Sequence, residues 1–276
     1  MMNEYGKITR MEINASRFFA DKRQIEADII IIYGDDARHI KSALRKTAGD
    51  RITVCDGAGT DYSCELIQIN ENEIRARILN SFPCAGEPPV KVTLYQALPR
   101  SDKFEYVIQK CVEGGVYEIA PVISAHTQFT DRLKGESGGR RLARWRRISY
   151  EAAKQSGRGI VPEISDPVSF SDAADACARF IGKSPDDRLA LIPYENEAKT
   201  SLKSALTTFK RRIAASGADA NPHICIFIGP EGGFSPDEIA QCRQNRIAPV
   251  TLGPRIYRTE SAGFAVLCQI MYEFES

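Results

Sequence analysis

The sequence predicts an α/β protein in which a small, mostly β domain precedes a parallel sheet covered by helices on both faces. Two observations lead to this fold class. Short apolar segments separated by turns fill the first third of the chain, a pattern typical of a β-meander. After a stretch rich in proline, apolar strands alternate with helical patterns, as in βαβ units. A chain of 276 residues accommodates both parts. We therefore expect a β domain over residues 1–82, a linker over 83–90 and an α/β domain over 91–276.

The first domain is expected to contain three consecutive strands and one helix. The strands are predicted over Asp50–Cys55, Ser63–Ile69 and Glu73–Leu79, with polar or glycine-containing turns between them. The helix precedes them. Its N-cap is expected at Asp35 or Asp36, and apolar residues follow at helical spacing until Gly49.

The second domain opens with a complete βαβ unit. Val92–Leu98 predicts a strand, the following apolar residues lie at helical spacing, and Val116–Ile123 predicts a parallel strand. Later strands are expected over residues 189–193, 224–228 and 250–252, each leading into a loop and then a helix. Ligands of such sheets bind at the carboxyl ends of the strands. Between the βαβ unit and these later strands, Gly135–Gly139 is predicted to be a surface loop.

Composition narrows the class of protein further. Apolar residues make up 43% of the chain, charged residues 26%, and no apolar run has the length of a membrane span. The N-terminus lacks the pattern of a secretory signal, so we expect a soluble, cytoplasmic protein without a membrane partner. The eight cysteines form no CxxC pair and are expected to be reduced core residues. The three histidines have no metal-ligand spacing, so we expect no metal site.

A glycine-rich loop, Gly229–Gly233, is the first candidate for ligand binding. It joins a buried strand to a helix that begins with a capping box, Ser235 with Glu238. Glycines allow a flat ligand to approach the backbone, but the loop is neither a Walker loop nor GxGxxG, and Glu231 would repel a bare phosphate. A ligand with cationic character, such as S-adenosylmethionine, fits better. The alternative is a glycine turn that only connects strand and helix.

A second candidate is the start of the last helix, where Arg258 and Glu260 follow the loop that begins at Gly253. The carboxylate of Glu260 suits the positive end of the helix dipole, whereas Arg255 and Arg258 are unfavourable there unless an anion compensates them. The alternative is a surface ion pair between Arg258 and Glu260, which would add little stability.

Basic residues at three- and four-residue spacing mark a predicted helix from about Arg140 to Gly157. A stripe of this kind suits contacts with RNA phosphates, although charge runs are more often only solvated faces. The stripe consists of Arg140, Arg144, Arg147, Glu151, Lys154 and Arg158.

Four motifs in the same order carry a resemblance to a known family. They are ALPRSDKFEYVIQKCVEGGV from Ala97, EAAKQSGR from Glu151, IGPEGGFSPDEI from Ile228 and LGPRIYRTESAGFAVL from Leu252. Together they resemble the 16S ribosomal RNA uridine N3-methyltransferase family (RsmE) of the SPOUT superfamily. The chain departs from that family's usual residues at Tyr257 and Ser261, and neither change removes an obvious chemical group.

The resemblance implies a fold, a cofactor and a set of site residues. It implies a PUA-like β-barrel domain, a C-terminal trefoil knot in the SPOUT domain, S-adenosylmethionine as cofactor and a homodimer. It implies cofactor contacts from Leu191, Pro193, Gly229, Glu231, Gly232, Leu252, Gly253, Ile256 and Arg258. The short motifs of the PUA-like domain and the basic stripe give the expected RNA contacts, which are Arg17, Phe19, His39, Arg45, Arg144, Arg147, Lys154 and Arg158. Arg258 and Glu260 are the expected catalytic residues.

The function expected from the sequence is therefore methyl transfer to N3 of a specific uridine of 16S ribosomal RNA, near the decoding region of the small subunit. Three alternatives stay open. The chain could be a SPOUT enzyme that methylates a ribose 2′-oxygen, a non-catalytic RNA-binding or ribosome-assembly factor, or a metabolic α/β enzyme. The last leaves the basic helix and the β domain unexplained.

Overall fold

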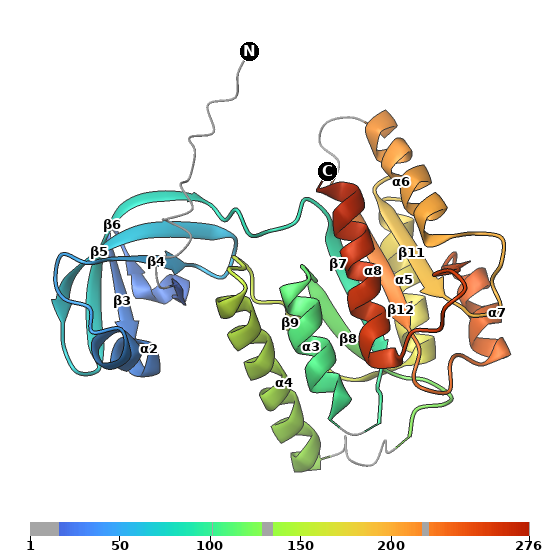
Figure 1. Ribbon diagram of the computed structural model, residues 1–276, viewed down its shortest axis with the longest axis horizontal. Coiled ribbons are helices and arrows are strands. Elements are labelled where there is room, and N and C mark those ends of the chain that lie inside the picture. Colours follow the sequence, from blue (N-terminus) through green and yellow to red (C-terminus); the bar gives the residue numbers. More distant parts are fainter. Residues whose placement is uncertain (1–16, 101, 129–134, 217–220, 276) are drawn as a thin grey trace. The chain divides into compact units, whose positions relative to one another are not determined.

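The structure, a computed structural model, describes residues 17–100, 102–128, 135–216 and 221–275. The chain divides into two compact units, and the smaller one is built from two separate segments. Unit 1 comprises Met1–Glu87 and Ala153–Val161, and unit 2 comprises Pro88–Ala152 and Pro162–Ser276. Figure 1 shows the elements of both units.

Unit 1 is formed around a six-stranded sheet in the order β1-β4-β5-β6-β3-β2. Its strands are β1 (Arg17–Phe19), β2 (Ile25–Glu26), β3 (Ile29–Tyr33), β4 (Arg51–Cys55), β5 (Thr60–Ile69) and β6 (Glu73–Pro83). All neighbours pair antiparallel except β1 and β4. The three predicted strands are confirmed as β4, β5 and β6. The register is fixed because alternate residues, such as Ile30, Ile32 and Ile74, are buried in one core.

The predicted helix of this unit exists, but its expected N-cap is wrong. Helix α2 (Gly34–Arg38) begins one residue before Asp35, and its N-cap is Tyr33, whose side chain makes no capping hydrogen bond. A π-helical turn, η2 (His39–Ala43), continues it. Gly34 has a φ of 66°, which glycine adopts without steric cost, so the chain turns sharply from β3 into the helix.

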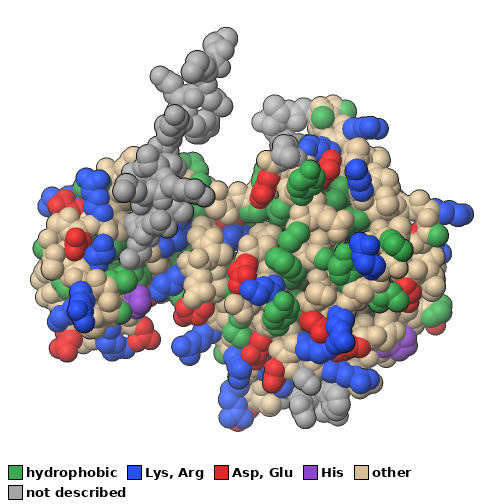
Figure 2. Space-filling model, in the orientation of Figure 1, with side chains coloured by type: hydrophobic (Ala, Val, Ile, Leu, Met, Phe, Trp, Pro, Cys, Tyr) green, Lys and Arg blue, Asp and Glu red, His purple; other side chains and the backbone are tan. Residues whose placement is uncertain are grey.

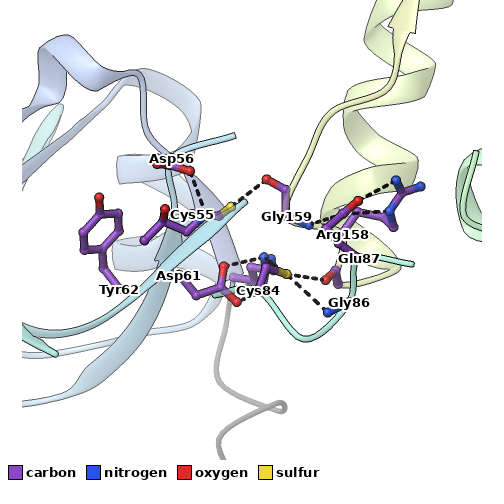
Figure 3. Close-up of polar contacts among 12 residues, drawn as sticks. Cys55, Asp56, Asp61, Tyr62, Cys84, Gly86, Glu87, Arg158 and Gly159 are labelled. Carbon is purple, nitrogen blue, oxygen red and sulfur yellow. Dashed lines mark hydrogen bonds and ion pairs between the residues drawn. The ribbon is translucent and has the colours of Figure 1, made fainter. Parts of the chain in front are cut away.

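Within unit 1, polar contacts join the segment 153–161 to the N-terminal segment of the unit (Figure 3). The Glu87 carboxylate accepts hydrogen bonds from the Arg158 guanidinium at 2.9 Å and from the Gly159 amide at 2.7 Å. The Cys55 thiol donates to the Gly159 carbonyl at 3.0 Å. Gly159 packs so closely that a Cβ there would lie 2.4 Å from the Cβ of Cys84. This segment is therefore an integral part of the small unit.

Unit 2 contains a seven-stranded sheet in the order β10-β8-β7-β12-β11-β13, with β9 paired to β8. Its strands are β7 (Lys91–Ala97), β8 (Glu118–Ile123), β9 (Glu163–Ile164), β10 (Val168–Ser169), β11 (Arg188–Pro193), β12 (His223–Ile228) and β13 (Ala248–Val250). Every pairing is parallel. The predicted α/β class with a parallel sheet is confirmed, whereas the trefoil knot stays a prediction.

Helices cover both faces of this sheet. In Figure 1, α8 and α3 lie in front of the strands and α5 lies behind them. Residues of α5 and α7 pack with the inward side chains of β11 and β12 in one core, which includes Cys177 and Phe227. The helices are α3 (Lys103–Glu113), α4 (Gly135–Gln155), α5 (Phe170–Lys183), α6 (Leu202–Ser216), α7 (Pro236–Gln244) and α8 (Thr259–Phe274).

Two local expectations for this unit are wrong. Gly135–Gly139, predicted to be a loop, forms the first turn of α4. Cys268, expected in the core, lies on the exposed side of α8, whereas the other seven cysteines are buried. All eight are free thiols. None of the helices in the described part of the chain is both long and apolar enough to cross a membrane.

Candidate active site

Three loops at the carboxyl ends of β11, β12 and β13 enclose a cavity of about 560 Å³. Because the strands are parallel and adjacent, their carboxyl ends meet at one edge of the sheet, where ligands of such folds bind. The volume lies in the range of small-molecule sites. We call this space the cofactor cavity. Its lining is Pro193–Glu195, Ile228–Phe234, Thr251–Tyr257, Thr259 and Ala262.

The β12 loop gives the cavity a wall made largely of backbone. A Cβ on Gly229 would lie 3.2 Å from the ring of Phe234, so the strand and the loop pack without room for a side chain. Gly233 has a φ of 68°, which permits the turn into α7. The predicted capping box of α7 is confirmed, since the Ser235 hydroxyl accepts from the Glu238 amide and the Glu238 carboxylate accepts from the Ser235 amide.

A buried hydrogen-bond chain connects the β13 loop to the β12 loop. The Thr259 hydroxyl donates to the Gly229 carbonyl at 2.6 Å and accepts from the Gln96 side-chain amide at 3.1 Å. Thr259 and Gln96 are both buried. Because Thr259 is the first residue of α8, this chain fixes the start of that helix against the cofactor cavity.

Lys103 links two carboxylates of the site. Its ammonium lies 3.3 Å from Oε1 of Glu231 and 3.3 Å from Oε2 of Glu260. The Glu231 carboxylate also accepts from the Arg100 amide at 3.1 Å. Burial alone would raise the pKa of Glu231, but hydrogen bonds from two backbone amides and from Lys103 outweigh it and lower that pKa. Glu231 is therefore ionised at neutral pH, which favours a cationic ligand.

Most of the residues expected to bind the cofactor lie on the cavity wall. Pro193, Gly229, Glu231, Gly232, Leu252, Gly253 and Ile256 all line it. Leu191 does not, since it is completely buried within β11. Arg258 also does not line it, although its neighbours Tyr257 and Thr259 do.

Arg258 and Glu260, the expected catalytic pair, have different surroundings. Arg258 is the N-cap of α8 and is exposed, and within the described ranges its guanidinium has no hydrogen-bond or ionic partner. The Glu260 carboxylate is largely buried and paired with Lys103. The alternative of an ion pair between Arg258 and Glu260 is thus not what the structure contains.

Sequence reasoning missed three residues of this site. Glu195 adds a second carboxylate to the cavity, and its Oε1 lies 3.3 Å from the position of a Cβ on Gly233. Lys103 and Thr259 hold the loops together, as described above. Glu195 and Thr259 follow the carboxyl ends of β11 and β13, and this position is the only signal of them in the sequence. Lys103 lies in the motif that begins at Ala97, but no local pattern indicates its contacts, because both of its partners are more than one hundred residues away.

The residues expected to contact RNA from unit 1 fall into two groups. His39 and Arg45 are exposed and Phe19 is partly exposed. Arg17 instead makes a partly buried bidentate contact with Asp61, with N···O distances of 2.8 and 2.6 Å. Burial alone would lower the pKa of Arg17, but the Asp61 carboxylate outweighs it and raises that pKa. Lys154 pairs with Asp36 and lies over the ring of Phe18.

The basic stripe on α4 is shorter than expected. Arg144 and Arg147 are exposed, and Arg144 pairs with Glu105 at 2.8 Å. The expectation that Arg158 continues this stripe is wrong, because the helix ends at Gln155 and Arg158 is 3% exposed in its contact with Glu87. Gly157, with a φ of 73°, turns the chain away from the helix.

In the parts of both units that the structure describes, no group of three or more histidine, cysteine, aspartate or glutamate side chains is placed to hold a metal ion.

The sequence matches two families of RNA methyltransferase domains. Residues 86–271 match the RNA methyltransferase domain family, and residues 32–79 match the RNA methyltransferase PUA domain. Because the first match spans more than half of the chain, the chain belongs to the RNA methyltransferase domain family.

Individual relatives narrow this class. The chain is 30% identical over 262 residues to Ribosomal RNA small subunit methyltransferase E of Bacillus subtilis (strain 168), which covers 94% of this chain and 97% of the relative. It is 30% identical over 251 residues to the protein of the same name from Mesomycoplasma hyopneumoniae (strain 232), covering 91% and 96%. A solved structure of the Neisseria gonorrhoeae protein of that name, bound to S-adenosyl methionine, matches with a TM-score of 0.74 and 28% identity, covering 94% of this chain and 97% of that chain.

Proposed function

We propose that this chain transfers a methyl group from S-adenosylmethionine to N3 of one uridine in 16S ribosomal RNA, within the small ribosomal subunit near the decoding region. The observation that carries the proposal is the cofactor cavity, whose glycine-rich wall and two carboxylates suit a flat ligand with positive charge. The relatives named Ribosomal RNA small subunit methyltransferase E, which match both units, support the choice of RNA. The S-adenosyl methionine bound to the N. gonorrhoeae protein supports the choice of cofactor.

The residues of the cavity fit this cofactor. Backbone groups of Gly229, Gly232 and Gly253 allow close approach of an adenine ring, and Leu252 and Ile256 supply apolar contacts. The carboxylates of Glu231 and Glu195 match the positive charges of the cofactor's sulfonium and ammonium groups. When bound, S-adenosylmethionine supplies an electrophilic methyl group on its sulfonium. No phosphate-binding chemistry is required of the loops, in agreement with the carboxylate on the glycine-rich loop.

Arg258 is our first choice for the catalytic residue. Uracil must lose its N3 proton to become a nucleophile, and the resulting negative charge spreads over its two carbonyl oxygens. A free guanidinium at the start of α8 is suited to stabilise that charge or to hold an adjacent phosphate. Glu260, which is held by Lys103, orients the start of the helix rather than approaching the base.

The exposed cations offer contacts for the RNA phosphates. We assign this role to Arg144, Arg147, Arg45 and His39, with Phe19 beside them, and we assign Arg17, Lys154 and Arg158 to internal ion pairs of unit 1.

Assembly and location complete the proposal. Ile256 is 91% exposed and Tyr272 on α8 is 80% exposed, and Figure 2 shows hydrophobic side chains grouped on the face that carries α8. Exposed apolar side chains of this kind suit a protein interface, so we propose a homodimer formed through this face. We also propose that the protein acts in the cytoplasm, because its proposed substrate is the ribosomal subunit.

One experiment tests reaction and target together. Small ribosomal subunits from a strain without the modification are incubated with the protein and labelled S-adenosylmethionine, and the modified nucleoside is mapped by mass spectrometry. We expect N3-methyluridine at one position of 16S RNA. A methylated ribose would overturn the substrate while keeping the cofactor, and absence of cofactor binding would favour a non-catalytic RNA-binding factor.

Variants test the role of Arg258. Arg258→Ala is expected to lower the rate of transfer by about 100-fold or more, because one charge-stabilising group of an active site is worth this much. Arg179→Ala is the control, since Arg179 is also an exposed arginine but lies on α5, away from the cavity. Near-normal transfer by the Arg258 variant would refute the role.

A further inference from the structure

A second cavity of about 410 Å³ lies beside the cofactor cavity and shares Glu231 and Gly232 with it. Its other walls include Arg100, which follows β7, and the turn Ala125–Gln128, which follows β8. Both cavities therefore open at the carboxyl edge of the same parallel sheet. We call this space the second cavity.

The turn that lines the second cavity is held rigidly. One carboxylate, that of Glu238, accepts from the Ala125 amide at 2.9 Å and from the Ser235 amide at 2.8 Å, so the cap of α7 also fixes this turn. Within the turn, the Thr127 hydroxyl accepts from the Ser124 amide at 2.9 Å. The shape of the cavity is thus set by partly buried hydrogen bonds before any ligand binds.

His126 forms the border between the two cavities. A Cβ on Gly232 would lie 3.1 Å from the Cβ of His126, so the side chain packs directly on the shared wall. Nδ1 of the ring lies 3.1 Å from the Gly233 carbonyl. A carbonyl only accepts, so Nδ1 carries the hydrogen, and Nε2 of the neutral ring is left as a hydrogen-bond acceptor.

The acceptor of a methyl group must come within about 3–3.5 Å of that group, so its pocket has to adjoin the cofactor cavity. A base that reacts at its pairing edge must be unpaired or flipped out of a helix. A volume of about 410 Å³ accommodates one nucleotide but no paired segment.

We propose that the second cavity is the binding pocket for the methyl-accepting nucleotide, and that it takes one unpaired pyrimidine nucleotide of an RNA. The reacting edge of the base faces Gly232 on the wall shared with the cofactor cavity, where the methyl group is delivered. Gln128 and Nε2 of His126 offer hydrogen bonds to the polar groups of the nucleotide, and Arg100 offers a cation for its phosphate. This assignment rests on the proposed function, because it names the substrate pocket of the same reaction.

A filling variant separates this pocket from the cofactor cavity. Ala125 is exposed and contributes only its amide to the fold, so Ala125→Trp keeps the hydrogen bond to Glu238 and places a large ring in the second cavity. We expect the affinity for S-adenosylmethionine, measured by calorimetry, to stay within about twofold, whereas kcat/KM for small subunits falls by about 100-fold. Ala125→Ser, the matched control, is expected to keep both.

A pair of substitutions at His126 tests the ring itself. In His126→Asn the side-chain amide still donates to the Gly233 carbonyl, whereas His126→Ala removes both the ring and this contact. If Nε2 contacts the nucleotide, both variants raise KM for small subunits and leave cofactor affinity unchanged. Full activity of the asparagine variant would show that His126 does not contact the nucleotide.

A measurement on the unaltered protein keeps the proposal testable if the tryptophan variant fails to fold. Subunits that carry 4-thiouridine at the position methylated by the protein are irradiated in the complex, and the cross-linked peptide is sequenced. A cross-link to residues 125–128 or to Arg100 supports the pocket, and a cross-link confined to residues 17–87 overturns it.

If the unaltered protein methylates a uridine and Ala125→Trp does so equally well, the pocket is wrong. If the unaltered protein methylates no uridine, the proposed function itself fails.

Discussion

Replacing Lys103 with methionine should leave two carboxylates facing each other without a cation. The Lys103 ammonium lies 3.3 Å from an oxygen of Glu231 and from an oxygen of Glu260, so these oxygens are at most twice that distance, about 6.6 Å, apart. At an effective dielectric constant of about 20, two unit charges at that separation repel by about 2.5 kcal/mol. Because the side chains are partly exposed, solvent screening reduces this to about 1–2 kcal/mol.

The assay is urea unfolding followed by the fluorescence of Trp145, the only tryptophan in the chain. Trp145 is buried on α4 and packs edge-on against Phe104, the residue after Lys103, with ring centroids 4.5 Å apart. Its signal therefore reports unfolding of the region that contains the substitution. We expect Lys103→Met to lower the free energy of unfolding by about 1–2 kcal/mol at pH 7.5.

The pH dependence identifies the cause. The pKa of Glu231 is lowered in the folded protein, so its stabilising contribution is present above the pKa of an unfolded glutamate and is lost as the pH falls through the folded-state value. The difference between Lys103→Met and the unaltered protein should therefore stay constant from pH 7.5 down to about pH 4.5, the value of an unfolded glutamate, and shrink as the pH falls further. Lys110→Met is the control, since Lys110 is on the same helix, is 31% exposed against 35% for Lys103, and pairs with one carboxylate only. Equal losses in both variants, or a loss independent of pH, would refute the reasoning.

Three further substitutions have expected outcomes. Gly159→Ala should destabilise unit 1 by about 1–3 kcal/mol, because its Cβ would lie 2.4 Å from that of Cys84; hydrogen exchange of the strands in this unit measures it. Gly182→Ala, where no atom lies within 4 Å of the added Cβ, should instead stabilise α5 by about 0.5 kcal/mol in the Trp145 assay. Burial and then two nearby cations lower the pKa of His223 to about 4, so the unfolded chain takes up a proton first and stability falls as the pH drops from about 6.5 to 4. His223→Gln should remove about 1–2 kcal/mol of this loss at pH 5, and an unchanged pH profile would contradict it.

The fold was predictable because local patterns and tertiary packing agree. Alternating apolar residues predicted β4, β5 and β6, and the continuous apolar run of β12 predicted a buried parallel strand. The capping box at Ser235 fixed the start of α7 within one residue. The start of α2 was missed, since Asp35 and Asp36 resemble capping residues but Gly34 allows the helix to begin earlier.

The features that could not be predicted from the sequence depend on contacts between residues that are distant along the chain. In the sequence, the helical spacing of basic residues extends to Arg158. In the structure, the chain leaves the helix before Gly157, and the Arg158 guanidinium pairs with Glu87 in unit 1. The ends of this contact are separated by 71 residues, and no local pattern connects them. Lys103 lies within the motif that begins at Ala97, but nothing local in that motif indicates its two partners, which come from the β12 loop and the start of α8.

Arg258 differs from the largely buried arginines Arg17 and Arg158 in its surroundings. Arg17 and Arg158 each lie against a carboxylate and are largely buried, so their charge is already compensated. Arg258 is exposed at the positive end of α8, and the described part of the chain provides no anion for it. A cation at that position costs about 0.3–1 kcal/mol. A uracil that loses its N3 proton, or a phosphate beside it, would offset this cost, and the same interaction would lower the barrier to methyl transfer because it strengthens as negative charge develops.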